Sequence, residues 1–319
     1  MSKLDELIQQ YCPDGVEYKP VKEVYHRLRG TPITAAKMKE IESTDGDVRI
    51  FAGGKTVIDA YEEDIPNANI TRVPAVLVQS RGVIDAVYYE RPFTFKNEMW
   101  AYTHENKTAV KFLYYVLKNN MGKFREAASG MGSLPQISLK VTEDFEMPVP
   151  PLEVQSEIVR ILDNFTELTA ELTAELTARK KQYEYYRDKL LTCDDNIAVK
   201  RIGDITRVFS ASRVHKDEWT TEGVPFYRSS DVISYFNGVE NSRGKAYISK
   251  ELYEKLSAKS GKICKDDILI TGGGTIGVPY IVPNDDPIYM KDADLLCIQH
   301  SKEFDSRYLY HYFLSTLFR

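Results

Sequence analysis

The chain repeats itself at the scale of a whole domain. Three short segments of its first half recur in the same order in its second half, displaced by 181, 192 and 196 residues (202 − 21, 267 − 75 and 308 − 112). The pairs are Val21–Val24 with Ile202–Ile205, Ala75–Ser80 with Asp267–Gly272, and Phe112–Tyr115 with Tyr308–His311. Because the displacement drifts slowly, as insertions in loops would make it, the pattern predicts two related domains and not a solenoid. Two related domains suit a protein that makes two related contacts.

Between the repeated halves lies a long stretch with helical periodicity. Leu152 to Leu191 contains no glycine or proline, and it includes three successive Glu-Leu-Thr-Ala tetrads from Glu167 to Ala178. Its apolar residues recur at steps of three and four, which predicts an amphipathic helix whose apolar stripe needs a partner helix or subunit. At about 1.5 Å per residue the helix would span roughly 60 Å, which suits a spacer between two domains. A core helix of one large domain is the alternative.

The apolar stripe of this helix is a candidate subunit interface. We expect it to be exposed in the isolated chain and buried in a complex, because exposed apolar stripes of this size usually mark an interface. Self-association is one way to cover it. The candidate interface residues are Ile158, Leu162, Phe165, Leu172, Tyr183, Tyr186 and Leu190.

The composition fits a cytoplasmic protein of two or three domains. The chain has 319 residues, of which 43% are hydrophobic and 28% are charged, and no apolar stretch approaches the length of a membrane span. Met1 to Ile8 alternates charged and apolar residues and lacks the apolar block of a signal peptide, which predicts a short amphipathic helix. The net charge of −5 argues against a protein that coats nucleic acid by itself, but it leaves local basic patches open.

Each half is expected to fold as a mixed domain, which makes the fold class α+β. Strands rich in Val, Ile and Tyr are expected with few helices between them, which is not the pattern of a doubly wound sheet. The expected strands are 48–51, 75–79 and 83–89 in the first half and 224–227, 267–271 and 280–282 in the second. The expected helices are 109–118, 251–257 and 306–318.

A search for catalytic chemistry finds none. Gly272 to Gly277 satisfies G-x-G-x-x-G after an expected strand, but Pro279 and Pro283 prevent the helix that a dinucleotide site needs, so a turn is expected. The five histidines form no metal-type pair, and no nucleophile elbow is present. The four cysteines, Cys12, Cys193, Cys264 and Cys297, have no metal-type spacing and are expected to be free thiols. A binding role without a metal is therefore expected.

Small, polar and basic residues are expected on the turns between strands of both halves. Arg, Lys, Gln, Asn and Ser side chains can read base edges and hold phosphates, so double-stranded DNA is the candidate ligand. Solvated loops are the alternative for any single residue, but equivalent loops recur in both halves. The candidate DNA-binding residues are Arg49, Gly53, Gly54, Lys55, Gln79, Ser80, Arg81, Lys96 and Asn97 in the first half, and Arg213, Arg228, Ser229, Ser230, Arg243, Lys245, Thr271 and Lys291 in the second.

The chain resembles, over its whole length, the specificity subunit of type I restriction–modification systems. The resemblance rests on four segments, of which the combination of the third and fourth is the most specific. These segments are Leu7-Ile8 with Tyr11-Cys12-Pro13-Asp14-Gly15-Val16-Glu17-Tyr18, then Gly132-Ser133-Leu134-Pro135-Gln136-Ile137-Ser138, Pro148-Val149-Pro150-Pro151-Leu152-Glu153-Val154-Gln155, and Arg179-Lys180-Lys181-Gln182-Tyr183-Glu184-Tyr185-Tyr186-Arg187. The tandem tetrads resemble the IC-type branch of that family.

The resemblance implies a non-catalytic subunit that recognises a bipartite DNA target. It implies two target recognition domains, 16–150 and 193–319, each reading half of a split site, with an N-terminal helix over 1–15 and a helical spacer over 151–192. Modification subunits, which hold S-adenosylmethionine, dock at the spacer, and restriction subunits complete the complex. Against the family pattern, the chain ends at Arg319 before a second proline motif and helix, so the second domain is expected to be incomplete. The alternative is an assembly adaptor without independent DNA readout.

Overall fold

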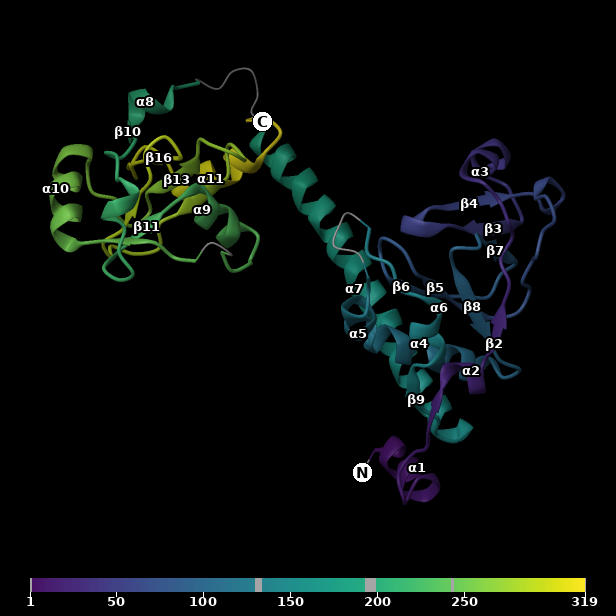
Figure 1. Cartoon of the computed structure of the whole chain (residues 1–319). Coiled ribbons are helices and arrows are strands. Elements are labelled where there is room, and N and C mark those ends of the chain that lie inside the picture. The colour runs from purple at the N-terminus through teal and green to yellow at the C-terminus, as the bar shows by residue number, and fades with distance from the viewer. Residues whose placement is uncertain (1, 130–133, 193–198, 242–243, 319) are drawn as a thin grey trace. The chain divides into compact units, whose positions relative to one another are not determined.

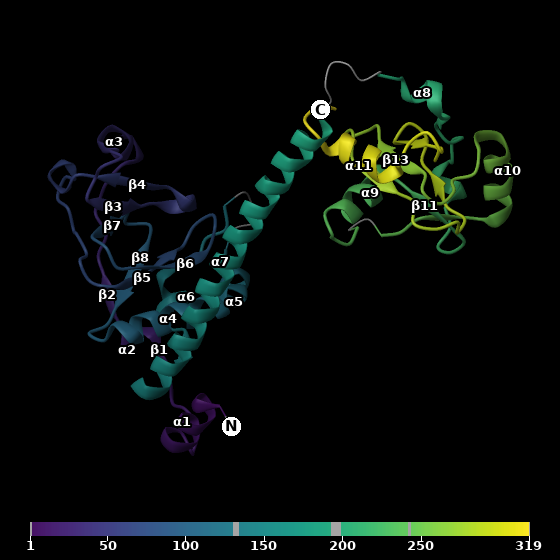
Figure 2. The same ribbon diagram turned by 180° about the vertical axis from the view of Figure 1, so that it is seen from behind.

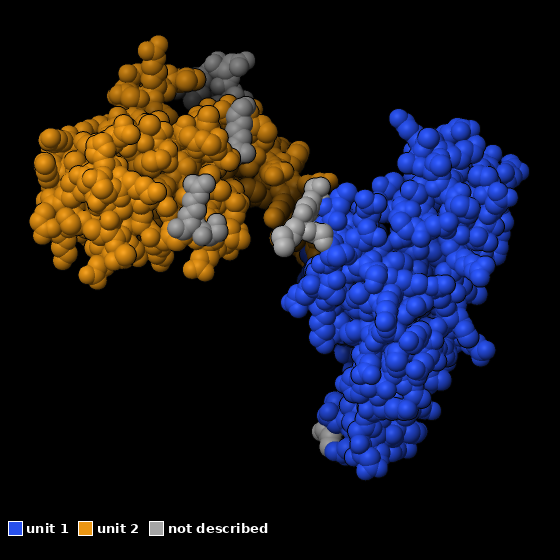
Figure 3. Space-filling view, in the orientation of Figure 1, with its two compact units in different colours: residues 1–172 blue, residues 173–319 orange. Residues whose placement is uncertain are grey.

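The chain folds into two compact units. The computed structural model describes residues 2–129, 134–192, 199–241 and 244–318. The first unit comprises Met1–Leu172 and the second comprises Thr173–Arg319, coloured separately in Figure 3. The boundary between them falls inside a single helix, α7 (Leu152–Leu191), so the spacer expected from the sequence is shared by the two units.

The first unit contains two small sheets, one of four strands and one of three. A four-stranded antiparallel sheet has the order β2-β8-β5-β6, and a three-stranded sheet has the order β4-β3-β7 with β3 and β7 parallel. The strands are β2 (His26–Leu28), β3 (Val48–Phe51), β4 (Val57–Ala60), β5 (Ala75–Gln79), β6 (Asp85–Tyr89), β7 (Phe93–Phe95) and β8 (Trp100–Thr103), joined in part by the short helical turns η1 (Gly53–Lys55) and η2 (Glu62–Asp64).

Helices cover the larger sheet of the first unit (Figure 1). α4 (Lys107–Asn119) packs on β5 and β6, and it begins where the Asn106 side chain accepts hydrogen bonds from two backbone N–H groups of its first turn. Val110, Leu113 and Leu117 recur at helical spacing and are fully buried in the core beneath it. The remaining elements of this unit are α1 (Lys3–Tyr11), β1 (Tyr18–Pro20), α2 (Val21–Val24), α3 (Ala35–Ile41), α5 (Met121–Glu126), α6 (Leu139–Glu143) and β9 (Glu146–Pro148), which pairs with β1.

The start of α7 is anchored in the first unit by polar contacts. Glu157 is 4% exposed and lies 2.6 Å from the Arg160 guanidinium and 3.2 Å from the Lys3 ammonium. The hydrogen bond from Arg160 is the main cause that lowers the pKa of Glu157 to about 2, and the Lys3 ammonium acts in the same direction. Further along, the Tyr115 hydroxyl donates to Asp163 at 2.6 Å, which ties α4 to α7. Burial and this carboxylate raise the pKa of Tyr115 to about 12.

The second unit repeats the two sheets. Their orders are β10-β16-β13-β14 and β12-β11-β15, again with one parallel pair, β11 and β15. α11 packs on β14 of the larger sheet, and Figure 2 shows the second unit from behind, with α11 beside β13. The elements are α8 (Ile202–Ile205), β10 (Val208–Phe209), η3 (Lys216–Glu218), β11 (Val224–Tyr227), α9 (Ser229–Phe236), β12 (Tyr247–Ile248), α10 (Lys250–Ser260), β13 (Ile268–Thr271), β14 (Pro279–Ile281), β15 (Tyr289–Met290), β16 (Leu295–Ile298) and α11 (Ser306–Leu314).

The strand registers confirm that the two halves of the sequence are copies. Val76 pairs with Tyr102, and Ile268 pairs with Ile298. These positions differ by 192 (268 − 76) and 196 (298 − 102), which are the displacements read from the sequence. Arg27 and Val208, the partners of Tyr102 and Ile298 on the next strand, differ by 181 (208 − 27). The prediction of an α+β fold with a long central helix is confirmed, and residues 272–277 form a turn as expected.

Candidate DNA interface

In the first unit, separate turns meet at one end of the sheets. A Cβ atom built on Gly82 would lie 3.8 Å from the Cα of Gly54 and 3.6 Å from the Leu134 side chain, so the β5–β6 turn touches both η1 and the segment after residue 133. Gly54, Lys55 and Gly82 all have positive φ values, of 71°, 73° and 75°. Such backbone conformations suit tight turns and let the main chain approach a ligand closely. The structure therefore brings Lys55 and Arg81 together on one surface.

The basic candidates of the first unit divide into paired and unpaired side chains. Arg49 lies within β3 and makes a bidentate ion pair with Asp59, with both N–O distances at 2.8 Å. This pair raises the pKa of Arg49 and lowers that of Asp59. Lys96 contacts Glu98 at 3.0 Å. Lys55 and Arg81 are exposed, and no ion pair is recorded for either within the described ranges, so their charges are available to phosphates or base edges.

Two polar candidates of the first unit lie inside the protein. Gln79 and Ser80 are buried, Gln79 at the end of strand β5, and the Ser80 hydroxyl donates to the carbonyl of Glu98 at 2.5 Å. The Ile137 N–H donates to the Ser80 carbonyl at 2.9 Å. These contacts join the β5–β6 turn to its neighbours. Gln79 lies in β5 and not on the turn that follows it, and the burial of both side chains differs from the expectation that they face DNA from that turn. Asn97 is exposed, as expected.

In the second unit, two turns and the start of α9 meet around Asp294. Its carbonyl accepts hydrogen bonds from the Ser229 hydroxyl and the Gly272 N–H, each at 2.7 Å. Its carboxylate lies 3.1 Å from the Lys291 ammonium. Thr271 is buried in β13, and its hydroxyl donates to the carbonyl of Thr275 at 2.5 Å, which closes the glycine-rich turn. Thr271 is the last residue of β13, inside the expected strand 267–271, whereas Ser229 was expected on a turn and is the first residue of α9.

Arg228 occupies a buried network and not a solvated turn. Its guanidinium donates to Asp231 at 2.9 and 3.1 Å and to the carbonyl of Gly244 at 2.5 Å, and it lies 5.7 Å from the centre of the Trp219 ring. The residue is 9% exposed. Asn241 also donates to Asp231. We assign Arg228 a positioning role, because its donors already have partners inside the protein.

The other candidates of the second unit differ in exposure. Arg213 and Lys245 are exposed, and no ion pair is recorded for either in the described part of the chain. The Ser230 hydroxyl is buried without a recorded partner there. Arg243 lies outside the described residues, as do Gly132, Ser133 and Cys193. Arg213 and Lys245 are therefore the exposed basic candidates of the second unit, as Lys55 and Arg81 are those of the first.

The apolar stripe of α7 is largely uncovered. Phe165 is 63% exposed and Leu190 is 80% exposed, while Leu172, Tyr183 and Tyr186 are about half exposed. Ile158 and Leu162, nearer the start of the helix, are half-buried. In the second unit the Tyr183 hydroxyl lies 2.7 Å from the His311 ring, and Asp188 accepts from the Thr316 hydroxyl at 2.7 Å. The stripe thus offers an apolar surface that the described residues leave open.

The described residues form no cluster of metal ligands and no membrane-spanning helix. No group of three or more His, Cys, Asp or Glu side chains there could hold a metal ion. Cys12 and Cys297 are buried free thiols, and Cys264 is an exposed one. No helix in the described ranges has both the length and the hydropathy that crossing a membrane requires.

Comparison with known proteins identifies the class. Residues 13–179 match the family model of the type I restriction modification DNA specificity domain. A putative type I restriction enzyme specificity subunit of Haemophilus influenzae is 34% identical over 314 residues, which cover 93% of this chain and 76% of that protein. The chain therefore belongs to the family of type I restriction–modification specificity subunits, a family defined by DNA specificity and not by catalysis.

Other relatives agree with this assignment. A type I restriction enzyme specificity subunit of Escherichia coli is 30% identical over 248 residues, which cover 73% of this chain and 58% of that protein. The crystal structure of a type I system S subunit from M. genitalium has a TM-score of 0.57 and 15% sequence identity, over 94% of this chain and 77% of that one. At this identity the structural likeness supports the fold alone.

Proposed function

We propose that each unit reads one half of a bipartite DNA target. The observation that carries the proposal is the repetition of the same pair of sheets in a chain that belongs to a DNA specificity family. Each copy presents exposed basic side chains, Lys55 and Arg81 in the first and Arg213 and Lys245 in the second. In this proposal the arginines contact base edges and the lysines contact phosphates.

We further propose that the exposed stripe of α7 docks the modification subunits of a restriction–modification complex. Those subunits would hold S-adenosylmethionine, and restriction subunits would join the assembly. The three tetrads at 167–178 support a place in the IC-type branch. The solvent exposure of Phe165 and Leu172, which are apolar and have little contact with the rest of the chain, supports the docking role.

The decisive experiment maps methylation in cells that carry this chain and its modification subunit. Sequencing of methylated positions across the genome should return a motif of two short specified blocks separated by an unspecified gap. The control is the same strain carrying the modification subunit alone. A single uninterrupted motif would contradict the assignment of one half-site to each unit, and methylation that does not depend on this chain would contradict the DNA-specificity role.

An assembly adaptor without independent DNA readout is the second candidate function. The exposed stripe of α7 favours it, because such a surface binds protein irrespective of DNA. Leu172→Lys places a charge on the stripe, and Glu171→Lys places the same charge on the exposed surface beside it. We expect Leu172→Lys alone to reduce self-association or capture of the modification subunit, measured by light scattering at tens of micromolar. Equal behaviour of the two variants would show that the stripe is not an interface.

A further inference from the structure

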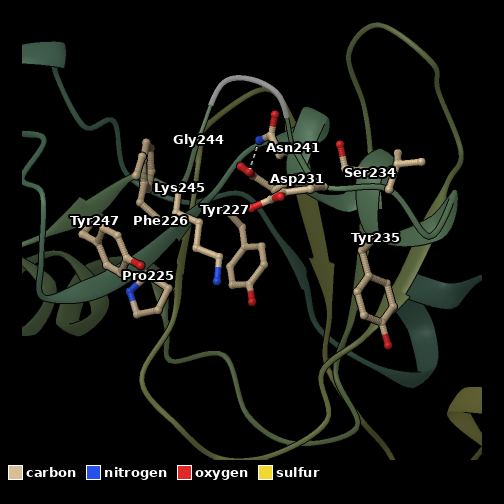
Figure 4. A pocket seen from close by; sticks show the side chains of 13 residues that line it. Pro225, Phe226, Tyr227, Asp231, Ser234, Tyr235, Asn241, Gly244, Lys245 and Tyr247 are labelled. Atoms are coloured by element: carbon tan, nitrogen blue, oxygen red, sulfur yellow. Dashed lines mark hydrogen bonds between the residues drawn. The ribbon is translucent and has the colours of Figure 1, made fainter. Parts of the chain in front are cut away.

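The second unit contains a cavity beside helix α9. Its volume is about 360 Å³, and it lies between the end of β11, helix α9 and the segment that leads into β12. Three tyrosines, Tyr227, Tyr235 and Tyr247, contribute to its lining, together with Ser234 and Lys245. Figure 4 shows Tyr227, Tyr235 and Lys245 projecting in the same direction from different elements. A cavity of this size with aromatic walls and a few polar groups has the character of a ligand site.

The cavity arises from a difference between the two copies of the domain. In the first unit, paired residues Val48 and Ala60 are 12 positions apart (60 − 48), and the tight turn η1 joins their strands. In the second unit, the paired residues Val224 and Ile248 are 24 positions apart (248 − 224), and the extra length forms α9 and the loop after it. The cavity therefore lies where the first unit has Lys55, one of the residues of its candidate DNA interface.

The walls of the cavity are held in place by contacts behind it. The buried guanidinium of Arg228 joins Asp231 on α9 to the carbonyl of Gly244, which connects the two sides of the inserted segment. Tyr280 on β14 contacts the rings of both Tyr227 and Tyr235, with centroid distances of 5.8 and 4.8 Å. These contacts fix two aromatic rings at the cavity, of which Tyr235 remains 71% exposed and Tyr227 is half-buried.

An exposed tyrosine held by a second ring is poorly explained by core packing alone. Aromatic side chains on a nucleic-acid-binding surface serve as platforms on which bases stack. Proteins that draw a base out of a duplex place it in a close-fitting pocket with stacking walls and nearby polar groups. Lys245, which is exposed at the cavity, supplies a positive charge for the phosphate that such a base carries with it.

We propose that this cavity receives one unstacked base of the DNA bound by the second unit. The inference rests on the proposed function, because it needs the second unit to contact a half-site. It predicts that the two units read DNA differently: the first through the grooves of an intact duplex, and the second partly by extruding a base.

The test uses the full chain with its modification subunit, after methylation mapping has supplied the target. Duplexes carry 2-aminopurine at successive positions of the second half-site, and a parallel set carries a single mismatch at each position. At one position other than the methylated base, we expect a severalfold rise in 2-aminopurine fluorescence. A mismatch at the same place should tighten binding, because an unpaired base costs less to extrude.

Two variants and a control connect this signal to the cavity. Tyr235→Ala removes a stacking wall and should weaken binding of the second half-site roughly 10-fold, while Ser234→Trp fills the space and should abolish the fluorescence rise. Tyr308→Ala, an exposed tyrosine on α11 that does not line the cavity, is the matched control.

The outcomes separate the cavity from the proposed function. If no position responds and mismatches never tighten binding while sequence-selective binding persists, the base pocket is wrong and the proposed function stands. If the response survives both cavity variants, the extruded base lies elsewhere and the inference is also wrong. If the complex shows no sequence-selective binding at all, the proposed function and the inference fail together.

Discussion

The two units share a scaffold but differ in the connections that lie at its candidate DNA interface. Between β3 and β4 the first unit has three residues of helical turn, whereas between β11 and β12 the second unit has α9 and a further loop. The strand orders and the central registers of the larger sheets are the same. The sheets therefore act as a constant support, and under the proposed function the connections would carry what distinguishes one half-site from the other.

The difference extends to how each unit uses an arginine near these strands. Arg49 and Asp59 are partly exposed and face each other across β3 and β4. Arg228 and Asp231 are nearly buried and connect α9 to the loop that follows it. An inserted segment needs such an internal anchor, because it lacks the ladder of hydrogen bonds that holds a short hairpin.

The largest expected effect comes from removing that anchor. Arg228→Ala leaves the nearly buried Asp231 carboxylate without its cationic partner and should destabilise the second unit by about 3 kcal/mol. Arg49→Ala removes a partly exposed pair and should cost the first unit less than about 1 kcal/mol. Hydrogen exchange of peptides from β11 and β3 measures the two effects separately. Replacing Arg228 with Met and Asp231 with Leu together should restore most of the loss, and equal losses for the two alanine variants would remove the contrast between the units.

Substitution of the exposed Arg81 or Arg213 should weaken DNA binding and leave stability unchanged, in contrast to substitution of the buried Arg228. Arg81→Ala should cost ~1–3 kcal/mol of DNA binding and relax specificity at one position of the first half-site only. Arg213→Ala should do the same at the second half-site. Gel shifts of the assembled complex on base-substituted duplexes measure both. Arg91→Ala, at the opposite end of β6 from Arg81, is the control; if Arg81→Ala leaves affinity and preference unchanged, Arg81 is no base contact.

The scaffold could be predicted from the sequence because its signals are local. The bounds of β3, β5, β11 and α7 match the expected ranges residue for residue, since runs of β-branched residues and a long period of three and four residues specify them. β6 begins two residues later than expected, because the chain first completes the turn around Gly82. The repeat could also be recognised from the sequence, because apolar core positions recur in the same order in both halves.

The site was less predictable because it depends on distant partners. Lys55 and Arg81 were chosen for their glycine neighbours. Lys96 and Lys291 pair with Glu98 and Asp294, which are two and three positions away in the sequence. The burial of Arg228 against Trp219 and the carbonyl of Gly244 depends on tertiary contacts that no local pattern reveals. The sequence also missed α9 and the cluster of Tyr227, Tyr235 and Tyr280. The excess of tyrosine, 21 residues in the chain, was the available signal, but it does not say which rings meet.

Lowering the pH should destabilise the first unit through Glu157. This effect should be smaller than those expected for Arg228→Ala and Arg81→Ala. The pKa of Glu157 is lowered from 4.5 to about 2 in the folded first unit. Its contribution to stability is therefore complete above pH 4.5 and is lost as the pH falls toward 2. Glu157→Gln should flatten this dependence in the first unit and leave the second unit unchanged, as measured by urea unfolding at pH 2.5 to 6. Glu175→Gln, on the exposed part of the same helix, should alter neither; a wild-type slope in Glu157→Gln would show that another carboxylate is responsible.

The tetrads should affect only the length of the unspecified gap between the two proposed half-sites. Deleting Glu171–Ala174 removes four residues of α7, which is about 6 Å of axial rise and a rotation of roughly 40° beyond a full turn. Because B-DNA advances ~3.4 Å per base pair, the unspecified gap should shorten by one or two base pairs. Both half-site sequences should persist, since the tetrads contain no basic residue and their glutamates do not favour contact with phosphate. Methylation mapping in cells reads the gap directly. The control replaces Glu171 and Thr173 with alanine, which keeps both the length of α7 and Leu172. An unaltered gap, or a changed half-site, would show that the tetrads are helix-forming filler and that the units do not depend on α7 for their register on DNA.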